Sequence, residues 1–348
     1  MTALAKIDSI LADPLGHARA APAAIGYFGL ELPEDLLAAF GTAAHLPWVP
    51  DRPTPRADAW LEPSFPGSAR SVLEDWADGR FDFLERVLFT RGDDVSQRLY
   101  YYVCELQRRG EIGGPTPLIF DLAKIGRPTS LEHSVAATRR LCDSLGVDAA
   151  RLEQGIETAN LRRRALARLD SDRRAGGSLY ERIGRASLFS PEVFSVVPDD
   201  LPAQTFRGQM LLAGSAPPDD RLHVAVERQG WTVAAELHER ALDRLGPELV
   251  VGGDPVLAVA GRAHASPLGA RSFVDRAQWL LDKARRCRAD AVILWLASEE
   301  EALVWHVPRQ RRLLEEAGIP VLVLADRRWD ASDGAAEEIA EFIGRMAR

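Results

Sequence analysis

Residues 290–325 read DAVILWLASEEEALVWHVPRQRRLLEEAGIPVLVLA, and this stretch decides the fold class. An apolar run ends at three glutamates, and apolar residues then recur at helical spacing up to Gly318. A second apolar run, 319–325, follows directly. Two buried strands separated by a helix of this length predict a parallel pair of strands with a crossover helix. We therefore expect an α/β protein.

The same alternation of strand and helix occurs in two parts of the chain. Strand-like runs lie at 23–29, 85–90, 116–120, 209–214 and 231–237, with amphipathic helical patterns between them. Between the two parts, from about residue 131 to residue 174, the pattern is helical throughout. The fold class that we expect is two Rossmann-like (flavodoxin-like) parallel-sheet domains joined by a helical segment.

A chain of 348 residues is long for one hydrophobic core, which favours two domains. The expected bounds are a helical extension at 1–24, a first Rossmann-like domain at 25–128, a helical connection at 129–204 and a second Rossmann-like domain at 205–348. Lys and Arg number 43 against 51 Asp and Glu, a net charge of −8. That charge argues against nucleic acid or an anionic membrane as a partner.

Apolar runs in this sequence fall short of the roughly 20 residues that a membrane span requires. The first residues lack the order of charged and then apolar residues that is typical of a signal peptide. We therefore expect a cytoplasmic protein. Its three cysteines, Cys104, Cys142 and Cys287, lie in helical patterns without a CxxC pair, which favours structural thiols over metal ligands.

Ligands of open parallel sheets bind beyond the carboxyl ends of the strands, so the ends of the predicted strands contain the candidate site residues. Gly29, Gly214 and Ser215 follow two of these strands and are candidates for substrate binding. GxGxxG and GxxxxGK[ST] fingerprints are absent from the sequence, which argues against a dinucleotide or P-loop nucleotide site.

Asp93, Glu300 and His238 also lie at predicted strand ends. One interpretation is an acid–base group or a carboxylate–histidine site for a divalent metal. The other is structural: Asp93 and the glutamates at 299–301 would cap the helices that follow them. The second interpretation is the commoner one for acidic residues at helix starts, and both remain open at this stage.

Several segments together resemble the 2-hydroxyacyl-CoA dehydratase / benzoyl-CoA reductase subunit family, including the D component of 2-hydroxyglutaryl-CoA dehydratase. The resemblance extends from about residue 25 to residue 346 and is strongest at 275–330. It includes an N-x-x-R element, here Asn160 and Arg163, and a G-x-x-V-x-x-E stretch at 230–236. Each segment is weakly specific alone, whereas their order and spacing over most of the chain are specific.

The resemblance implies heterodimeric subunits that bind an acyl-CoA thioester and receive an electron from an ATP-dependent activator. In that family a 4Fe–4S cluster held by cysteines passes the electron on. Matched to this chain, the cysteine positions fall on Pro66, Asp93 and Glu300. Proline offers no side-chain ligand and carboxylates replace thiolates poorly. We therefore expect no cluster in this chain, and a 4Fe–4S cluster in a partner subunit.

Three functional hypotheses follow. The first is a cluster-free subunit that pairs with a cysteine-bearing paralogue and binds acyl-CoA, with Gly29, Arg70, Gly214 and Ser215 as candidate substrate contacts. The second is a stand-alone acyl-CoA-type lyase or hydrolase that uses Asp93, Glu300 and His238 as acid–base groups or ligands of a divalent metal. The third is a small-ligand binding or regulatory protein. Arg98 and Arg163 could contact phosphate or carboxylate groups, although such arginines are more often helix-surface cations.

Overall fold

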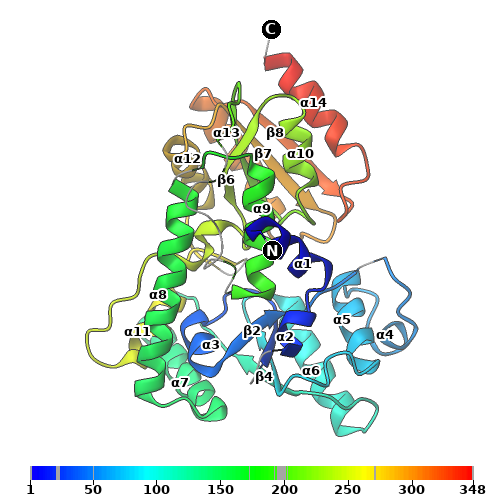
Figure 1. The fold of residues 1–348 in the computed structure, drawn as a ribbon, viewed down its shortest axis with the longest axis vertical. Helices are drawn as coiled ribbons and strands as arrows, with labels where there is room; N and C mark the ends of the chain where they lie inside the picture. Colours follow the sequence, from blue (N-terminus) through cyan, green and yellow to red (C-terminus); the bar gives the residue numbers. More distant parts are fainter. Residues whose placement is uncertain are drawn as a thin grey trace. The chain divides into compact units, whose positions relative to one another are not determined.

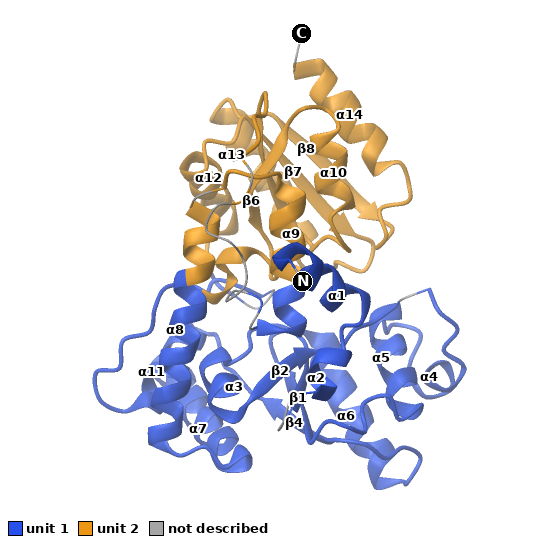
Figure 2. Cartoon of the chain, in the orientation of Figure 1, with its two compact units in different colours: residues 1–164, 186–193, 246–273 blue, residues 165–185, 194–245, 274–348 orange. Residues whose placement is uncertain are grey.

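The computed structural model describes residues 2–20, 24–49, 51–171, 173–191, 193, 201, 203–269 and 272–346. The chain divides into two compact units, which Figure 2 shows in different colours. Unit 1 contains residues 1–164, 186–193 and 246–273, and unit 2 contains residues 165–185, 194–245 and 274–348. Each unit is built on its own parallel sheet.

The sheet of unit 1 has four parallel strands in the order β2-β1-β3-β4. The bounds of its strands are β1 Ala24–Phe28, β2 Thr42–His45, β3 Arg86–Thr90 and β4 Thr116–Phe120. The helices assigned to this unit are α1 Ala3–Ala12, α2 Gly16–Ala20, α3 Glu34–Phe40, α4 Pro55–Trp60, α5 Gly67–Ala77, α6 Asp94–Arg108, α7 Pro128–Leu145 and α11 Pro255–Ala265. The unit boundaries fall within α8, Ala149–Ser171, and α9, Gly177–Phe189.

The sheet of unit 2 has the equivalent order β6-β5-β7-β8. Figure 1 labels its strands β6, β7 and β8. Its strands are β5 Gln209–Gly214, β6 Thr232–Leu237, β7 Ala291–Ala297 and β8 Val321–Arg327. Its helices are α10 Arg221–Glu227, η2 Leu242–Leu245, α12 Arg276–Arg286, η3 Leu303–His306, α13 Val307–Glu316 and α14 Ala335–Met346. The two parallel sheets confirm the predicted α/β class with two Rossmann-like or flavodoxin-like sheets.

Helices cover both faces of each sheet, which explains why the strands read as continuous apolar runs. In unit 2, Met210 and Leu212 pack with residues of α10 and α14, whereas Leu211 and Ala213 pack with residues of α12 and α13. In unit 1, residues of α5 and α6 share one core with β1 and β3, and residues of α3, α7, α8 and α11 share the other. Successive strand residues therefore alternate between two cores.

Two details of the local structure differ from the sequence predictions. The α-helix expected directly after β7 begins only at Val307, after a turn and the short helix η3. Pro308 is compatible with this start, because the first turn of a helix needs no backbone N–H from that residue. The strand β2 was not predicted, because TAAH is short and contains only small residues in its apolar part. Both differences concern short elements, whose local signal is weak.

Residues 246–273 belong to unit 1, whereas the predicted bounds place them in the second domain. A buried ion pair contributes to this arrangement: Lys124 Nζ lies 2.5 Å from Glu31 Oε1, and both side chains are almost fully buried. Lys124 also donates to the backbone carbonyls of Ala263 and Ser266. One cation thus joins the loops after β1 and β4 to the end of α11. Of the predicted helical segment 129–204, residues 172, 192, 194–200 and 202 lie outside the described residues.

Gly214 is the last residue of β5 and has a φ of +114°. A Cβ atom at this position would lie 2.1 Å from the backbone carbonyl oxygen of Trp295 on the neighbouring strand. Only glycine fits here, both for its backbone conformation and for its space. Gly29, at the end of β1, has a similar φ of +105° and lies against Ser96 and Thr90.

We expect Gly214→Ala to lower the free energy of unfolding by about 2–4 kcal/mol, because the methyl group adds a backbone clash to an unfavourable φ. The matched control is Gly344→Ala in the interior of α14, where nothing lies within 4 Å of the new Cβ. That change should stabilise the protein by up to about 1 kcal/mol. Urea denaturation followed by circular dichroism measures both, and equal effects of the two changes would contradict this prediction.

Candidate functional site

Both sheets have one topological switch point, between β1 and β3 in unit 1 and between β5 and β7 in unit 2. Strands on the two sides of such a point connect in opposite directions, which leaves a crevice at their carboxyl ends where ligands bind. Gly29 and Asp93 follow β1 and β3. Gly214 and Glu300 lie at the end of β5 and after β7. These four predicted residues thus lie at the two switch points.

Asp93 is the N-cap residue of α6, and its Oδ1 accepts a hydrogen bond of 2.6 Å from the backbone N–H of Ser96. The hydroxyl of Ser96 in turn donates to the backbone carbonyl of Phe28 at 2.8 Å. The first turn of α6 is therefore attached to the end of β1. This contact is the one that the capping interpretation predicts.

Glu300 has the same kind of role after β7. Its Oε1 accepts hydrogen bonds from the backbone N–H groups of Ala302, at 3.0 Å, and Leu303, at 2.8 Å. Partial burial raises the pKa of this carboxyl group, although the two N–H donors oppose the shift. At the same switch point, Ser215 accepts a hydrogen bond from the backbone N–H of Ala297 and links β5 to β7.

Pro66 is the N-cap residue of α5, and Arg70 lies in the first turn of that helix. The guanidinium of Arg70 donates to Asp58 Oδ1 at 2.7 Å and to the backbone carbonyls of Glu62 and Phe65. These contacts close the loop between α4 and α5. The guanidinium nitrogens of Arg70 thus bind groups of the protein itself. Its predicted role in substrate binding stays a prediction.

The residues Asn160 and Arg163 form a structural joint in unit 1. Arg163 is buried, and it donates two hydrogen bonds of 2.7 and 2.8 Å to the two carboxylate oxygens of Asp35. Arg262 of α11 donates to the same carboxylate at 2.8 Å. Asn160 exchanges two hydrogen bonds with the backbone of Leu249. The expectation of a helix-surface cation at position 163 is therefore wrong, because a carboxylate from α3 pairs with it in the interior.

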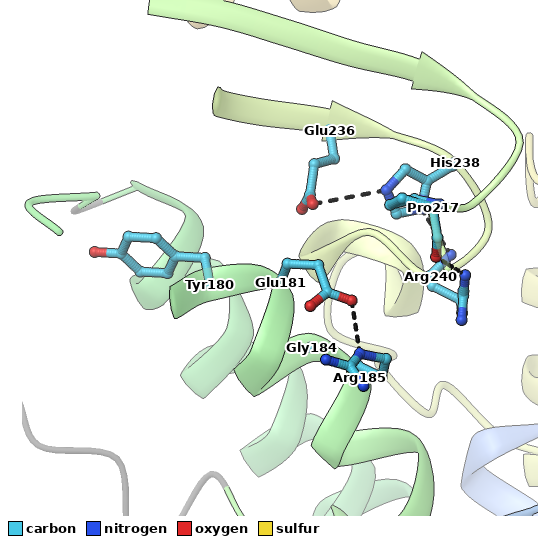
Figure 3. Close-up of a pocket in the computed structure, with 8 residues that line it drawn as sticks. All are labelled: Tyr180, Glu181, Gly184, Arg185, Pro217, Glu236, His238 and Arg240. Atoms are coloured by element: carbon cyan, nitrogen blue, oxygen red, sulfur yellow. Dashed lines mark hydrogen bonds and ion pairs between the residues drawn. The ribbon is translucent and has the colours of Figure 1, made fainter. Parts of the chain in front are cut away.

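A pocket lies in unit 2 at the carboxyl ends of β5 and β6, beside α9 (Figure 3). Most of the residues that line it are charged or polar, unlike those of the apolar cores of the same unit. The residues that line it are Tyr180, Glu181, Gly184, Arg185, Pro217, Glu236, His238 and Arg240. His238 is the only one of them that the sequence identified as a site residue.

Glu236 is the centre of a buried polar cluster beside this pocket. Its Oε1 lies 2.8 Å from His223 Nε2 and 3.7 Å from His238 Nε2, and its Oε2 lies 3.4 Å from the guanidinium of Arg173. Burial alone would raise the pKa of Glu236, but these partners outweigh it and hold the pKa well below its ordinary value. The carboxylate is therefore ionised, and His223 Nε2 must donate to it.

Sequence reasoning did not select Glu236 or His223 as functional residues. Glu236 is the acidic residue of the G-x-x-V-x-x-E stretch at 230–236, and a carboxylate inside a predicted buried strand was the available signal. Such a carboxylate requires a partner, because an unpaired buried charge is costly. The partners themselves come from α10 and from the segment before α9, which no local pattern links to β6.

The three cysteines lie away from the positions that match the cysteines of the family. Cys104 is on α6 and Cys142 is buried on α7, whereas Cys287 is the C-cap of α12 and donates to the backbone carbonyl of Ala284. Burial raises the pKa of each thiol, that of Cys142 to about 11. Thiolates are the ligands of iron–sulfur clusters. These residues, and those at positions 66, 93 and 300, do not fit a 4Fe–4S cluster.

The candidate metal ligands Asp93, His238 and Glu300 lie in two different units. Asp93 belongs to unit 1, whereas His238 and Glu300 belong to unit 2. Across the residues that the structure describes, no group of three or more His, Cys, Asp or Glu side chains is arranged to hold a metal ion. The stand-alone acid–base or metal enzyme stays a prediction without a specific contact in its favour.

None of the helices described is both long and apolar enough to span a bilayer.

Comparison with models of protein families gives a match over most of the chain. Residues 30–343 match the model of the family described as 2-hydroxyglutaryl-CoA dehydratase, D-component. The match includes all four strands of unit 2 and the strands β2, β3 and β4 of unit 1, and it confirms the resemblance found in the sequence. A search of curated proteins finds no match to this chain.

Proposed function

Because the chain belongs to the 2-hydroxyglutaryl-CoA dehydratase D-component family, we propose that it is a cluster-free subunit of an acyl-CoA dehydratase or reductase. The family description names one component of a multi-component enzyme. In this proposal the chain contributes its two switch points to the binding of an acyl-CoA thioester. A partner subunit supplies the redox cofactor.

One observation carries the cluster-free part of the proposal. The three positions that match the family's ligand cysteines hold Pro66, Asp93 and Glu300, and each begins a helix or the turn before one. Asp93 and Glu300 use carboxylate oxygens to bind backbone N–H groups. The chain keeps the helix starts of the family without its thiolates. A protein retained for its scaffold and its contacts with a partner would have this combination.

We expect the purified chain to contain no iron–sulfur cluster. After anaerobic purification, and after reconstitution with iron and sulfide, its iron and sulfide content should stay near zero and it should lack the brown absorption of a cluster. A cysteine-bearing member of the family, treated in the same way, is the positive control. About four iron atoms per chain would contradict the proposal, because that is the content of one 4Fe–4S cluster.

The partner is tested by co-expression with a cysteine-bearing paralogue from the same genome. We propose that the two chains co-purify as a heterodimer, that the heterodimer binds acyl-CoA, and that an ATP-dependent activator reduces the paralogue's cluster. Size-exclusion chromatography with mass determination measures the assembly. A stable homodimer that excludes the paralogue would contradict the partner role, whatever the iron content.

A further inference from the structure

The pocket at the ends of β5 and β6 contains a guanidinium group without a carboxylate partner. Arg240 Nη2 donates to the backbone carbonyl of Pro217, and among the described residues no carboxylate forms an ion pair with Arg240. The other charges of the pocket are matched: Arg173 faces Glu236, and Arg185 donates to Glu181 at 2.9 Å. The charged residues that line the pocket are two glutamates and two arginines, and of these Arg240 is the one whose guanidinium pairs with a backbone carbonyl instead of a carboxylate.

Two buried polar atoms of the pocket have no hydrogen-bond partner in the described part of the chain. One is His238 Nε2 and the other is Glu181 Oε2. The backbone N–H of Arg240 donates to His238 Nδ1 at 3.2 Å, so in the neutral ring Nε2 carries the hydrogen. The nearby Glu236 Oε1 lies 3.7 Å away, beyond hydrogen-bond distance. His238 Nε2–H therefore faces Glu236 across 3.7 Å and makes no hydrogen bond in the described part of the chain.

Burial acts on the two ionisable groups in the direction that removes their charge. It lowers the pKa of the Arg240 guanidinium, and it raises the pKa of the Glu181 carboxyl group although Arg185 opposes that shift. An anion in the pocket would stabilise the charged guanidinium. It would also favour protonated Glu181, whose Oε2 would then be a further donor.

We propose that this pocket binds a small oxyanion, the carboxylate or phosphate group of a small molecule, between the guanidinium groups of Arg185 and Arg240 and the Nε2–H of His238. Guanidinium groups match the planar and tetrahedral oxygens of these two groups through charge-assisted hydrogen bonds. The pocket lies beyond the carboxyl ends of parallel strands, where such sheets place their ligands. The site is independent of the proposed function, since it uses none of Pro66, Asp93 or Glu300.

The test is isothermal titration calorimetry of the full-length chain at pH 7 and low chloride, with inorganic phosphate in one arm and succinate in the other. We expect saturable binding in at least one arm, with a Kd of about 1 mM or below, a typical order for a small site. Binding of phosphate alone identifies a phosphate site, binding of succinate alone identifies a carboxylate site, and binding of both supports the shared chemistry.

Arg240→Met should weaken that binding by roughly tenfold or more, because it removes a charge-assisted hydrogen bond and keeps the aliphatic stem. Arg207→Met is the matched control: Arg207 is an exposed arginine of unit 2 that also donates to a backbone carbonyl, that of Gln229. The affinity of Arg207→Met for the anion should equal that of the wild type. Circular dichroism verifies that each variant is folded.

Glu181→Gln provides a second test that does not depend on the folding of the Arg240 variant. It removes the carboxylate charge that opposes an anion, so we expect binding to tighten several-fold. The proposal is overturned if neither anion binds saturably, or if Arg240→Met binds like the wild type. It is equally overturned if Glu181→Gln weakens the binding.

Discussion

Asp35→Ala should destabilise unit 1 more than any surface substitution, by about 3–5 kcal/mol. The carboxylate of Asp35 is fully buried and accepts hydrogen bonds from two guanidinium groups, those of Arg163 and Arg262. Its removal takes away the carboxylate that these two buried cations share. For a unit of this size we expect the Tm to fall by at least roughly 6 °C. Differential scanning calorimetry or circular dichroism measures the change.

Two comparisons make the expectation for Asp35 specific. Arg163→Met should cost less than Asp35→Ala, because the pair between Asp35 and Arg262 survives it. Glu105→Ala removes a two-point contact with Arg108 on the surface of the same unit, and the Tm should not change measurably. A Tm of Asp35→Ala within 2 °C of the wild type, roughly 1 kcal/mol for a unit of this size, would show that the buried cluster does not stabilise the unit.

Glu236→Gln should destabilise unit 2 by about 3 kcal/mol or more at pH 7. The neutral amide can still accept from His223, but its NH₂ group would face Arg173 or His238, where a donor meets a donor. The positive charge of Arg173 then keeps only Asp170 as a partner among the described carboxylates. Urea denaturation at pH 7 measures the loss.

The effect of Glu236 should depend on pH in a defined direction. Its pKa is held well below the ordinary value of 4.5 in the folded protein, so its contribution to stability is fully present above pH 4.5. The contribution is lost as the pH falls through the lower, folded pKa. The difference in stability between the wild type and Glu236→Gln should therefore be constant from pH 5.5 to pH 7.5 and should shrink below pH 4.5.

The control for this titration is Glu341→Gln on the exposed face of α14. That variant should follow the wild type at every pH, since its ion pair with Arg345 is exposed and screened. A difference for Glu236→Gln that grows as the pH falls would contradict the ionised, buried state of this carboxylate. A difference that is already absent at pH 7 would contradict the stabilising role of the cluster.

The contacts of the N-x-x-R element, Asn160 and Arg163, become clear only in the folded chain. From sequence, Asn160 and Arg163 could serve a ligand or the solvent, since the helix around them carries many arginines. In the fold, Asn160 binds the backbone of Leu249 and Arg163 binds Asp35. The motif therefore joins the helix α8 to two distant segments of unit 1. Its role in this chain is structural.

For the pocket of unit 2, the sequence identified His238 but not the residues that surround it. His238 was a candidate because it follows a predicted strand, and this local reasoning correctly located a polar strand end. The partners Glu181, Arg185 and Arg173 lie in the helical connection, more than fifty residues earlier in the chain. Their arginines and acids are indistinguishable in sequence from those of a solvated helix face. Only the packing of α9, and of the segment before it, against this part of the sheet selects them.

The sequence by itself determined the α/β class, most strand positions, the family and the absence of cysteines at positions 66, 93 and 300. These features depend on local periodicity and on the order of segments, which a chain carries without folding. The tertiary structure alone decided that residues 246–273 join unit 1, that Arg163 is buried, and that Arg240 lies in a pocket without a carboxylate partner. The physical reason is that burial and charge pairing arise between residues far apart in sequence, as with Asp35 and Arg163, and are set only when the elements pack.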